Sequence, residues 1–331
     1  MPTYHVYGLG AALVDTEIEV SDQFLDQAGI EKGLMTLVDE ARQQELLEHM
    51  RQHQVGSKRA SGGSACNTII AASYFGAKAF YSCKVANDDN GTFFRHDLAS
   101  AGVDTKNGSD HDGITGKCLV MITPDAERSM NTFLGISETL SSDDIDEDAL
   151  KDSEWAYIEG YLVTSDTGRN AAITLSTLAK QNGVKTALSL SDPGMVEFFR
   201  DGLNEMIGDG VDLLFCNKDE ALGWTNTADV HEAAECMKRH AKTFVITLGK
   251  DGSLVYDGNT LELVEGKQVK AIDTNGAGDM FAGAFLYAIT AGKSYAQAAL
   301  LANHAAASVV SQYGPRLKAE QHDTVKASLN F

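Results

Sequence analysis

Asp273-Thr-Asn-Gly-Ala-Gly-Asp279 is a glycine-rich turn that opens onto an apolar helix expected over 277–291. Gly276 and Gly278 carry no Cβ, so backbone N–H groups can approach a ligand closely. Together with the helix N-terminus, these N–H groups form a site for phosphate oxygens. A carboxylate at Asp279 can accept the proton of an attacking hydroxyl beside that site. A plain turn with a capping Asp is the alternative.

A second glycine segment, Gly62-Gly63-Ser-Ala-Cys-Asn67, lies far upstream. Two adjacent glycines allow the backbone to approach a ligand, and Asn67 offers both a donor and an acceptor. Asp15 follows the first expected strand, where the ligand sites of α/β sheets usually open, and its carboxylate suits sugar hydroxyls. Each residue alone could serve a turn, a helix cap or the surface. Their occurrence together with the 273–279 turn favours a substrate site.

Two further segments end expected strands. Asn217-Lys-Asp-Glu220 follows the strand at 211–215, and an Asn and a Glu three residues apart project on one side of a first helical turn. Oxygen ligands of this kind suit Mg²⁺ held through water beside ATP phosphates. Thr247-Leu-Gly249-Lys-Asp-Gly252 ends the strand at 243–247 and is a natural turn for the phosphates or ribose of a nucleotide.

The order of elements predicts an α/β fold. Helical stretches separate most of the expected strands, which implies parallel βαβ units with right-handed crossovers and helices on both faces of the sheet. Residues 117–123 and 128–134 differ from this alternation of strands and helices, because the Pro-Asp turn between them predicts a hairpin. The acidic run at 141–148 is typical of a capped helix start rather than of a metal site. Strands are expected at 4–9, 79–85, 155–160, 184–190, 211–215 and 243–247.

The composition restricts what the chain binds. It has 331 residues, 43% of them hydrophobic, which suffices for a large core. Nucleic-acid binding needs clustered Lys and Arg, whereas 27 basic residues here face 47 acidic ones, with a net charge of −20. The sequence has no apolar run of bilayer length and no signal-peptide pattern, and its five cysteines contain no C-x-x-C pair. We therefore expect a cytoplasmic protein that binds neither nucleic acid nor membrane.

These segments resemble those of the PfkB, or ribokinase-like, carbohydrate and nucleoside kinases, in order and over nearly the whole chain. Gly62-Gly63-x-x-x-Asn67 with Gly91 is similar to the family's N-terminal signature, and Asn217-x-x-Glu220 to its magnesium-associated motif. Asp273-Thr-x-Gly-Ala-Gly-Asp279 is similar to its C-terminal signature, which is highly specific. Within the family, Gly8-Leu-Gly10-x-x-x-x-Asp15 and the segment near Phe24-Leu25 resemble the adenosine kinases.

The resemblance implies a ribokinase-like fold, with one kinase domain over 1–331 and a small β lid formed by segments at roughly 12–40 and 105–137. It also implies a role for each matching residue. The general base would be Asp279, with amides of Gly276, Ala277 and Gly278 forming an anion hole. The substrate would contact Asp15, Gly62, Gly63 and Asn67, and the lid residues Arg128 and Phe133. ATP would be bound by Thr247, Gly249, Gly252, Thr274 and Asn303, and Mg²⁺ would be positioned through water by Asn217 and Glu220.

We therefore expect an ATP- and Mg²⁺-dependent kinase that phosphorylates a hydroxymethyl group of a ribose-containing small molecule, first of all adenosine to AMP. The lid residues Leu119, Phe133 and Leu134 would form the slot for the purine. Alternatives are a sugar kinase acting on ribose or fructose, another nucleoside kinase, and a non-catalytic nucleotide- or nucleoside-binding paralogue, which would have no need of Asp279. Ala11 stands where many adenosine kinases have Asn, which removes one polar contact. The resemblance leaves a monovalent-cation requirement and a homodimer open.

Overall fold

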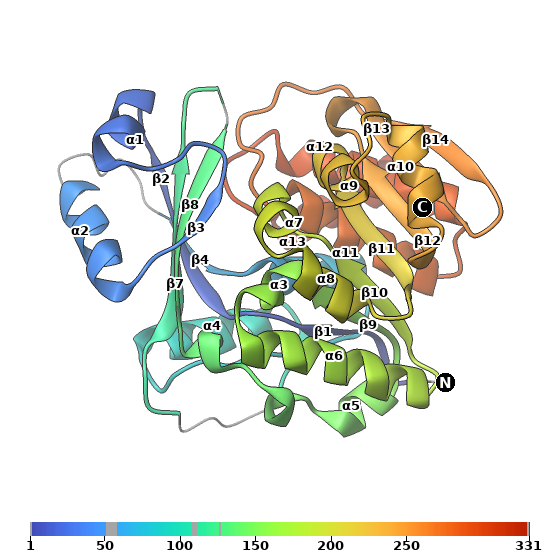
Figure 1. Cartoon of the computed structure of the whole chain (residues 1–331), viewed down its shortest axis with the longest axis horizontal. Helices are drawn as coiled ribbons and strands as arrows, with labels where there is room; N and C mark the ends of the chain where they lie inside the picture. The colour runs from blue at the N-terminus through green and yellow to red at the C-terminus, as the bar shows by residue number, and fades with distance from the viewer. Residues whose placement is uncertain (1, 51–57, 107–110, 126, 330) are drawn as a thin grey trace.

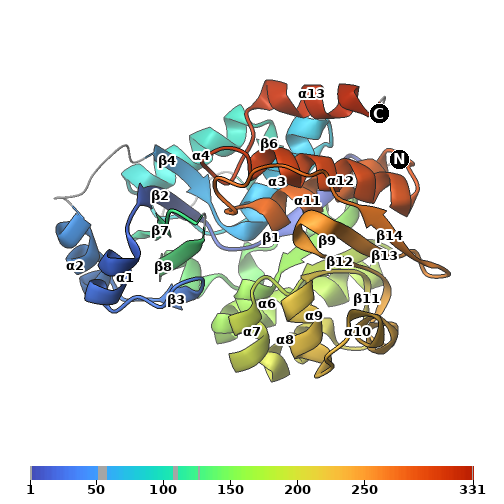
Figure 2. The same cartoon turned by 90° about the horizontal axis from the view of Figure 1, so that it is seen from above.

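The computed structural model describes residues 2–50, 58–106, 111–125, 127–329 and 331. Helices cover a large sheet on both of its faces, and a smaller sheet stands at one side (Figure 1). Seen from above, the smaller sheet projects from the main body with two helices, α1 (Asp22–Ala28) and α2 (Glu40–Met50), at its outer end (Figure 2). The chain therefore has a helix-covered core and a projecting second layer that faces it.

Nine strands form the large sheet within the described residues, in the order β14-β13-β12-β11-β10-β9-β1-β5-β6. All neighbours pair in parallel except β13 and β14, which continue the edge antiparallel. The expected strands are confirmed, whereas the antiparallel edge was not expected. The bounds are β1 (Tyr4–Leu9), β5 (Ala79–Ser82), β6 (Val103–Asp104), β9 (Ser153–Glu159), β10 (Lys185–Ser189), β11 (Val211–Asn217), β12 (Ala241–Thr247), β13 (Gly252–Tyr256) and β14 (Leu261–Glu265).

Two hydrophobic clusters hold the helices to the two faces of this sheet. One joins the sheet to α3, α4, α11, α12 and α13 through buried side chains such as Ile69, Phe285 and Leu301. The other joins it to α5 through α10 through side chains such as Leu175, Leu203 and Phe244. The bounds are α3 (Ser64–Phe75), α4 (Asp89–Ser100), α5 (Glu147–Lys151), α6 (Asp166–Gln181), α7 (Pro193–Phe198), α8 (Arg200–Ile207), α9 (Lys218–Thr225), α10 (Val230–Met237), α11 (Ala277–Thr290), α12 (Tyr295–Val309) and α13 (Ala319–Ser328).

The smaller sheet has the strand order β3-β8-β7-β2-β4. The hairpin expected near 117–134 is present as β7 and β8, while the other three strands were not expected. The helices α1 and α2 cover its outer face, where Phe24, Leu46 and Leu119 belong to one apolar cluster. The bounds are β2 (Leu13–Glu19), β3 (Met35–Leu37), β4 (Lys58–Gly62), β7 (Thr115–Ile122) and β8 (Arg128–Gly135).

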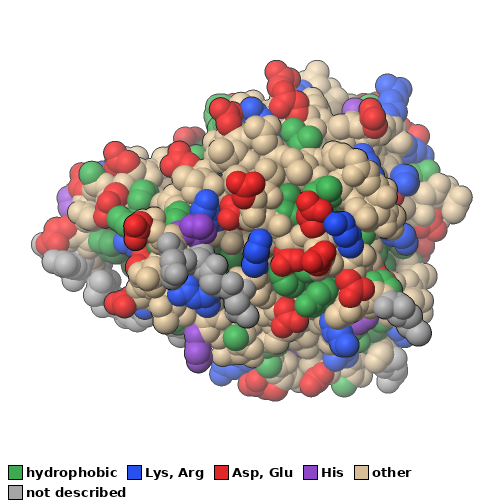
Figure 3. Space-filling model, turned by 90° about the horizontal axis from the view of Figure 1, so that it is seen from below, with side chains coloured by type: hydrophobic (Ala, Val, Ile, Leu, Met, Phe, Trp, Pro, Cys, Tyr) green, Lys and Arg blue, Asp and Glu red, His purple; other side chains and the backbone are tan. Residues whose placement is uncertain are grey.

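The acidic run at 141–148 forms helix starts, as expected. Ser141 accepts a hydrogen bond from the Asp143 amide, and Asp146 caps α5 by accepting one from the Ala149 amide at 2.9 Å. Each cap satisfies an N–H group that has no partner inside its helix. On the face shown in Figure 3, acidic and basic side chains are interspersed. Among the described residues, no helix is both long and apolar enough to cross a membrane.

Candidate active site

A cavity of about 480 Å³ opens between the carboxyl ends of the large sheet's parallel strands and the inner face of the smaller sheet. The register of the large sheet places polar residues of the cavity next to one another at the strand ends. Glu159 at the end of β9 pairs with Ser189 of β10, and Asn217 at the end of β11 pairs with Thr247 of β12. Ligand sites of open parallel sheets form at these strand ends, so the topology itself gathers these side chains.

The glycine turn before α11 borders this cavity. Gly276 has φ +72°, a conformation that favours glycine, and a Cβ there would collide with the backbone of Pro315. A Cβ at Gly278 would meet nothing within 4 Å, so this residue faces open space. The amides of a first helical turn have no intrahelical partner. Gly276, Ala277 and Gly278 all line the cavity, and the Ala277 amide also donates to the Thr274 carbonyl at 3.3 Å. The turn therefore has the form of an anion site.

Asp279 lies in the first turn of α11 and contacts the start of α3. Its Oδ1 accepts a hydrogen bond from the Ser64 hydroxyl at 2.6 Å, and its Oδ2 accepts one from Asn67 Nδ2 at 3.1 Å. Removal from bulk water raises its pKa to about 6, while these hydrogen bonds and the Arg128 charge oppose the rise. A carboxylate with this pKa is ionised at neutral pH and can still accept a proton.

Asp15 lines the cavity together with Asn67 of the glycine segment, near enough to Asp279 to feel its charge. Asp15 Oδ1 and Asn67 Oδ1 are buried at the cavity and have no hydrogen-bond partner in the part of the chain that the structure describes. Burial raises the pKa of Asp15 to about 8, and the charge of Glu17 adds to the rise. Buried oxygens without a partner are rare. These two are placed to accept hydrogen bonds from the hydroxyl groups of a ligand.

The two glycines of this segment, Gly62 and Gly63, lie at different positions relative to the cavity. Gly63, with φ +98°, lines the cavity, and a Cβ there would strike the carbonyl oxygen of Ala11. Gly62 is not among the residues that line the cavity. A Cβ on it would overlap the Asp15 carboxyl group, so the direct substrate contact expected of Gly62 is replaced by a steric role: its hydrogen leaves room for Asp15.

Glu159 was not anticipated from the sequence. It is 1% exposed and lines the cavity, and its two oxygens accept hydrogen bonds from the amides of Ala11 at 2.6 Å and Ala65 at 2.7 Å. Burial raises its pKa to about 7, partly opposed by these amides. The carboxylate thus joins the β1–β2 connection to the first turn of α3. Ala11 itself, although it lacks an amide side chain, lines the cavity and takes part through its backbone.

Asn217 and Glu220 form a reciprocal cap at the start of α9. Asn217 Oδ1 accepts a hydrogen bond from the Glu220 amide at 2.8 Å, and Glu220 accepts hydrogen bonds from the Asn217 amide at 3.0 Å and from Asn217 Nδ2 at 2.6 Å. Burial raises the pKa of Glu220 to about 8, and Asp192 adds to the rise. The described residues contain no group of three or more His, Cys, Asp or Glu side chains placed to hold a metal. This donor set therefore fits Mg²⁺ that keeps its waters, and does not fit a closed protein cage.

The residues expected to bind ATP line the same cavity. Thr247, Gly249, Gly252 and Thr274 border it directly. Asn303 borders it as well, but its amide nitrogen donates to the carbonyls of Val264 at 3.0 Å and Glu265 at 3.2 Å. Asn303 thus fixes the end of β14, whose following residues also line the cavity.

The smaller sheet supplies the opposite wall, and its register decides which residues reach it. On β8 the residues Arg128, Met130, Thr132 and Leu134 line the cavity, while Phe133 does not. Successive side chains of a strand point to opposite faces. Phe133 therefore points away from the cavity, and its neighbours Thr132 and Leu134 line it in place of the expected Phe133. Leu119 likewise packs against α1 and α2 on the outer face. Of the three residues expected to form a purine slot, only Leu134 lines the cavity.

A glycine turn at a helix start, with a carboxylate beside it and unpaired acceptors facing it, defines a phosphotransferase acting on a hydroxyl group. The chain matches the model of the pfkB family carbohydrate kinases over residues 33–322 and belongs to that family. It is therefore an ATP-dependent kinase with an alcohol group as acceptor.

Three proteins indicate which members of the family the chain is similar to. A probable sugar kinase from Rhizobium etli has 32% identity and a TM-score of 0.94, covering 100% of both chains. The adenosine kinase of Sinorhizobium meliloti has 34% identity and a TM-score of 0.92, covering 98% of this chain and 99% of its own. The adenosine kinase of Schizophyllum commune is 25% identical, covering 96% of this chain and 98% of its own.

Proposed function

We propose that the protein transfers the γ-phosphoryl group of MgATP to the hydroxymethyl group of a ribose-containing acceptor, and that adenosine is this acceptor. The observation that carries the proposal is the mixed lining of the cavity. Its floor holds Asp15, Asn67 and Asp279, which suit hydroxyl groups. The smaller sheet, which supplies Asp15, also supplies the apolar side chains of Leu13, Met35, Leu37, Met130 and Leu134, with Arg128 and Thr132 among them.

A lining that combines these polar groups with several apolar side chains suits a ligand that has both a ribose and an aromatic base. Ligand sites are mostly apolar, with a few polar groups that fix orientation. A free sugar has hydroxyls on every side and would leave some of them facing the apolar side chains without partners. The similarity to the adenosine kinase of S. meliloti supports the same choice.

In the proposed reaction, Asp15 and Asn67 orient the acceptor through their free oxygens. Asp279 takes the proton of the attacking hydroxyl, and its contacts with Ser64 and Asn67 hold the carboxylate in place. The amides at 276–278 stabilise the charge on the transferred group. The smaller sheet acts as a lid over the cavity and keeps water from competing with the acceptor.

Mg²⁺ would neutralise charge on the ATP phosphates. Asn217 and Glu220 would position it through water, since both Glu220 oxygens are already engaged by Asn217. Thr247, Gly249 and Gly252 would face the nucleotide, and the Asn303 contacts with Val264 and Glu265 would keep that end of the cavity open.

A sugar kinase is the second candidate. Two observations favour it: the similarity to the probable sugar kinase of R. etli, and Ala11 in place of the Asn expected in adenosine kinases. Glu159 also adds a carboxylate to the floor beside Ala11. A non-catalytic binding protein is not favoured, because Asp279 would then have no function.

The test is an assay of ADP release with adenosine, inosine, ribose and fructose as acceptors. Adenosine is expected to exceed ribose in kcat/KM by at least ~10-fold, which corresponds to burial of roughly 55 Å² of apolar surface at ~25 cal/mol per Å². Ribose or fructose equal to adenosine would overturn the nucleoside proposal and leave the kinase activity standing. As a matched variant, Leu134→Ala should lower kcat/KM for adenosine by about fivefold and change that for ribose by less than about twofold, since only the base would contact this side chain.

A further inference from the structure

One partly buried ion pair lies between the two glycine segments of the site and belongs to neither. Arg316 follows α12, and its Nη2 lies 2.8 Å from Asp97 Oδ2 on α4. The two side chains are only 14% and 27% exposed. Each partner favours the charged form of the other: the pKa of Asp97 is lowered even though burial acts to raise it, and the pKa of Arg316 is raised although burial acts to lower it.

The backbone around Arg316 packs on the phosphate turn. The Gly314 amide donates to Asp273 Oδ2 at 2.8 Å, and Asp273 Oδ1 accepts from the Asn275 amide at 2.8 Å. The carbonyl of Pro315 lies where a Cβ on Gly276 would be. Residues 314–315 thus support the turn from behind, and Arg316 is the next residue along the chain.

The other end of the ion pair holds the acceptor segment. The Asp97 oxygen that binds Arg316 also accepts hydrogen bonds from the Ser61 hydroxyl and, at 3.3 Å, from the Ser61 amide. Ser61 is 0% exposed and precedes Gly62 on β4. One carboxylate oxygen therefore receives donors from the loop behind the phosphate turn and from the strand that ends in the glycine pair.

We propose that Arg316 is a positioning residue that keeps the acceptor segment and the phosphate turn in register through Asp97 and Ser61. Reacting atoms must be placed closely for in-line transfer, and a misplacement of about 1 Å can cost ~10²-fold in rate. The planar guanidinium fixes direction in a way that an ammonium group does not. A partly buried pair of this kind is weak evidence for stability by itself. The positioning role is supported by Asp97 Oδ2, which receives donors from Arg316 and from Ser61. The charge of Arg316 also lowers the pKa of Asp15, against the effect of burial.

This inference rests on the proposed roles of the two glycine segments and holds for any acceptor that is phosphorylated. The test compares Arg316→Gln, Arg316→Lys and Ser61→Ala with the control Arg169→Gln, whose guanidinium contacts Asp166 and Glu205 away from the cavity. For Arg316→Gln we expect kcat to fall about tenfold and the acceptor KM to rise about tenfold, with the KM for ATP within twofold. Arg316→Lys and Ser61→Ala should each raise the acceptor KM about threefold, and Arg169→Gln should change neither constant.

A purely structural ion pair gives another pattern. It would lower the midpoint of thermal unfolding and leave both kinetic constants of the folded variant within twofold of the original, and this result for Arg316→Gln would overturn the proposal. If Arg316→Gln does not fold, an unchanged acceptor KM in both Arg316→Lys and Ser61→Ala overturns it. Full turnover of Asp279→Asn would instead contradict the assignment of the site itself, so the two failures are distinguishable.

Discussion

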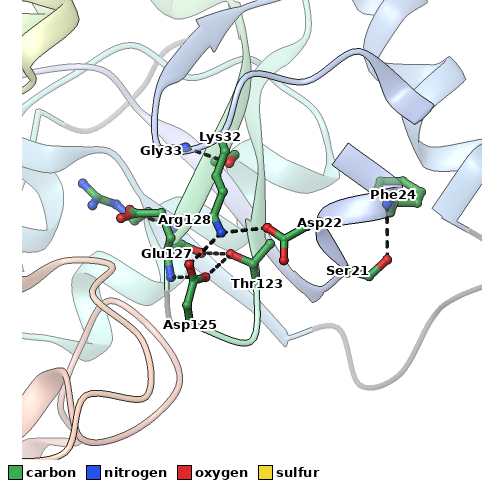
Figure 4. A network of polar contacts seen from close by, with 10 residues as sticks. Ser21, Asp22, Phe24, Lys32, Gly33, Thr123, Asp125, Glu127 and Arg128 are labelled. Carbon is green, nitrogen blue, oxygen red and sulfur yellow. Dashed lines mark hydrogen bonds and ion pairs between the residues drawn. The ribbon is translucent and has the colours of Figure 1, made fainter. Parts of the chain in front are cut away.

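Asp125 and the carboxyl groups of the cavity have opposite pKa shifts. In the cavity, burial raises the pKa of Asp15 and Glu220 to about 8 and of Glu159 to about 7. At the outer end of the smaller sheet, Lys32 lies between Asp22 and Asp125, 2.7 Å from each (Figure 4). There, hydrogen bonds from Lys32 and Thr123 lower the pKa of Asp125 to about 2.

The difference shows that surroundings, not residue type, decide what an acidic residue does. The exposed acids around Lys32 remain hydrated and paired, and they connect α1 to the turn between β7 and β8 (Figure 4). The cavity acids have lost water and gained few positive partners, so their protonation changes close to neutral pH. We therefore expect substitutions in the two groups to have very different effects.

The largest effect is expected for Asp279→Asn. Asn keeps the size of the side chain but cannot take the proton of the acceptor, so kcat should fall by at least ~10²-fold with nearly unchanged binding of both substrates. Initial rates and calorimetric titrations measure the two quantities. The matched control is Asp125→Asn, an exposed acid far from the reacting groups, which should keep kcat within twofold. Turnover of Asp279→Asn close to that of the original protein would contradict the role of the base.

A smaller effect is expected from pH on the stability of the ligand-free protein. Asp15, Glu159, Glu220 and Asp279 have folded-state pKa values of about 6 to 8, above their unfolded values near 4. Because the folded state then binds more protons, stability is greatest below the unfolded pKa and is lost as pH rises through the folded values. The midpoint of thermal unfolding should fall by a few degrees between pH 5 and pH 8.

The same measurement on variants separates the two groups of acids. Asp15→Asn removes one buried carboxyl group that titrates near neutral pH, and it should therefore make this pH dependence shallower. Asp125→Asn should leave it unchanged, because the stabilisation that the lowered pKa of Asp125 provides is constant above its unfolded pKa near 4 and is lost only as pH falls toward about 2. A midpoint that rises steadily from pH 5 to pH 8 would contradict the raised pKa values in the cavity.

The smallest effect is expected for Lys32→Met. This substitution removes both ion pairs shown in Figure 4, yet exposed pairs contribute little and are screened by salt. The midpoint of unfolding should change slightly at low ionic strength and not measurably at high salt, and kcat should stay within twofold. A kcat lowered more than about threefold would mean that Lys32 controls the position of β3, which follows it and supplies Met35 and Leu37 to the cavity.

The sequence predicted the large sheet better than the smaller one, for physical reasons. Strands such as β9 and β11 are buried on both faces and have continuous apolar runs that are easily recognised. In β2, by contrast, Asp15, Glu17 and Glu19 occupy alternate positions, so one face of the strand carries acids. The sequence of β4, Lys-Arg-Ala-Ser-Gly, has almost no apolar signal. These strands form through pairing with β7 and each other, which local sequence does not reveal.

The candidate site shows the same division. Residues within glycine motifs, such as Asn67 and Asp279, were predicted and lie together, because a motif fixes both spacing and backbone form. Glu159 belongs to no motif, and its importance depends on two amides distant in sequence. Phe133 was expected at the cavity, whereas its neighbours Thr132 and Leu134 line it. The sequence of a hairpin does not reveal which face of a strand turns toward the cavity.

The crowding around the glycines has a consequence for how this enzyme can evolve. Side chains at Gly63 or Gly276 would collide with backbone carbonyls, which cannot move aside cheaply. Met35, Leu37, Met130 and Leu134 instead enter the cavity as side chains, and exchanging them alters its shape without moving the main chain. If the proposed acceptor binds here, mutation is free to change the acceptor while the glycine segments stay constant, and randomised libraries at these four positions offer the direct route to new substrates.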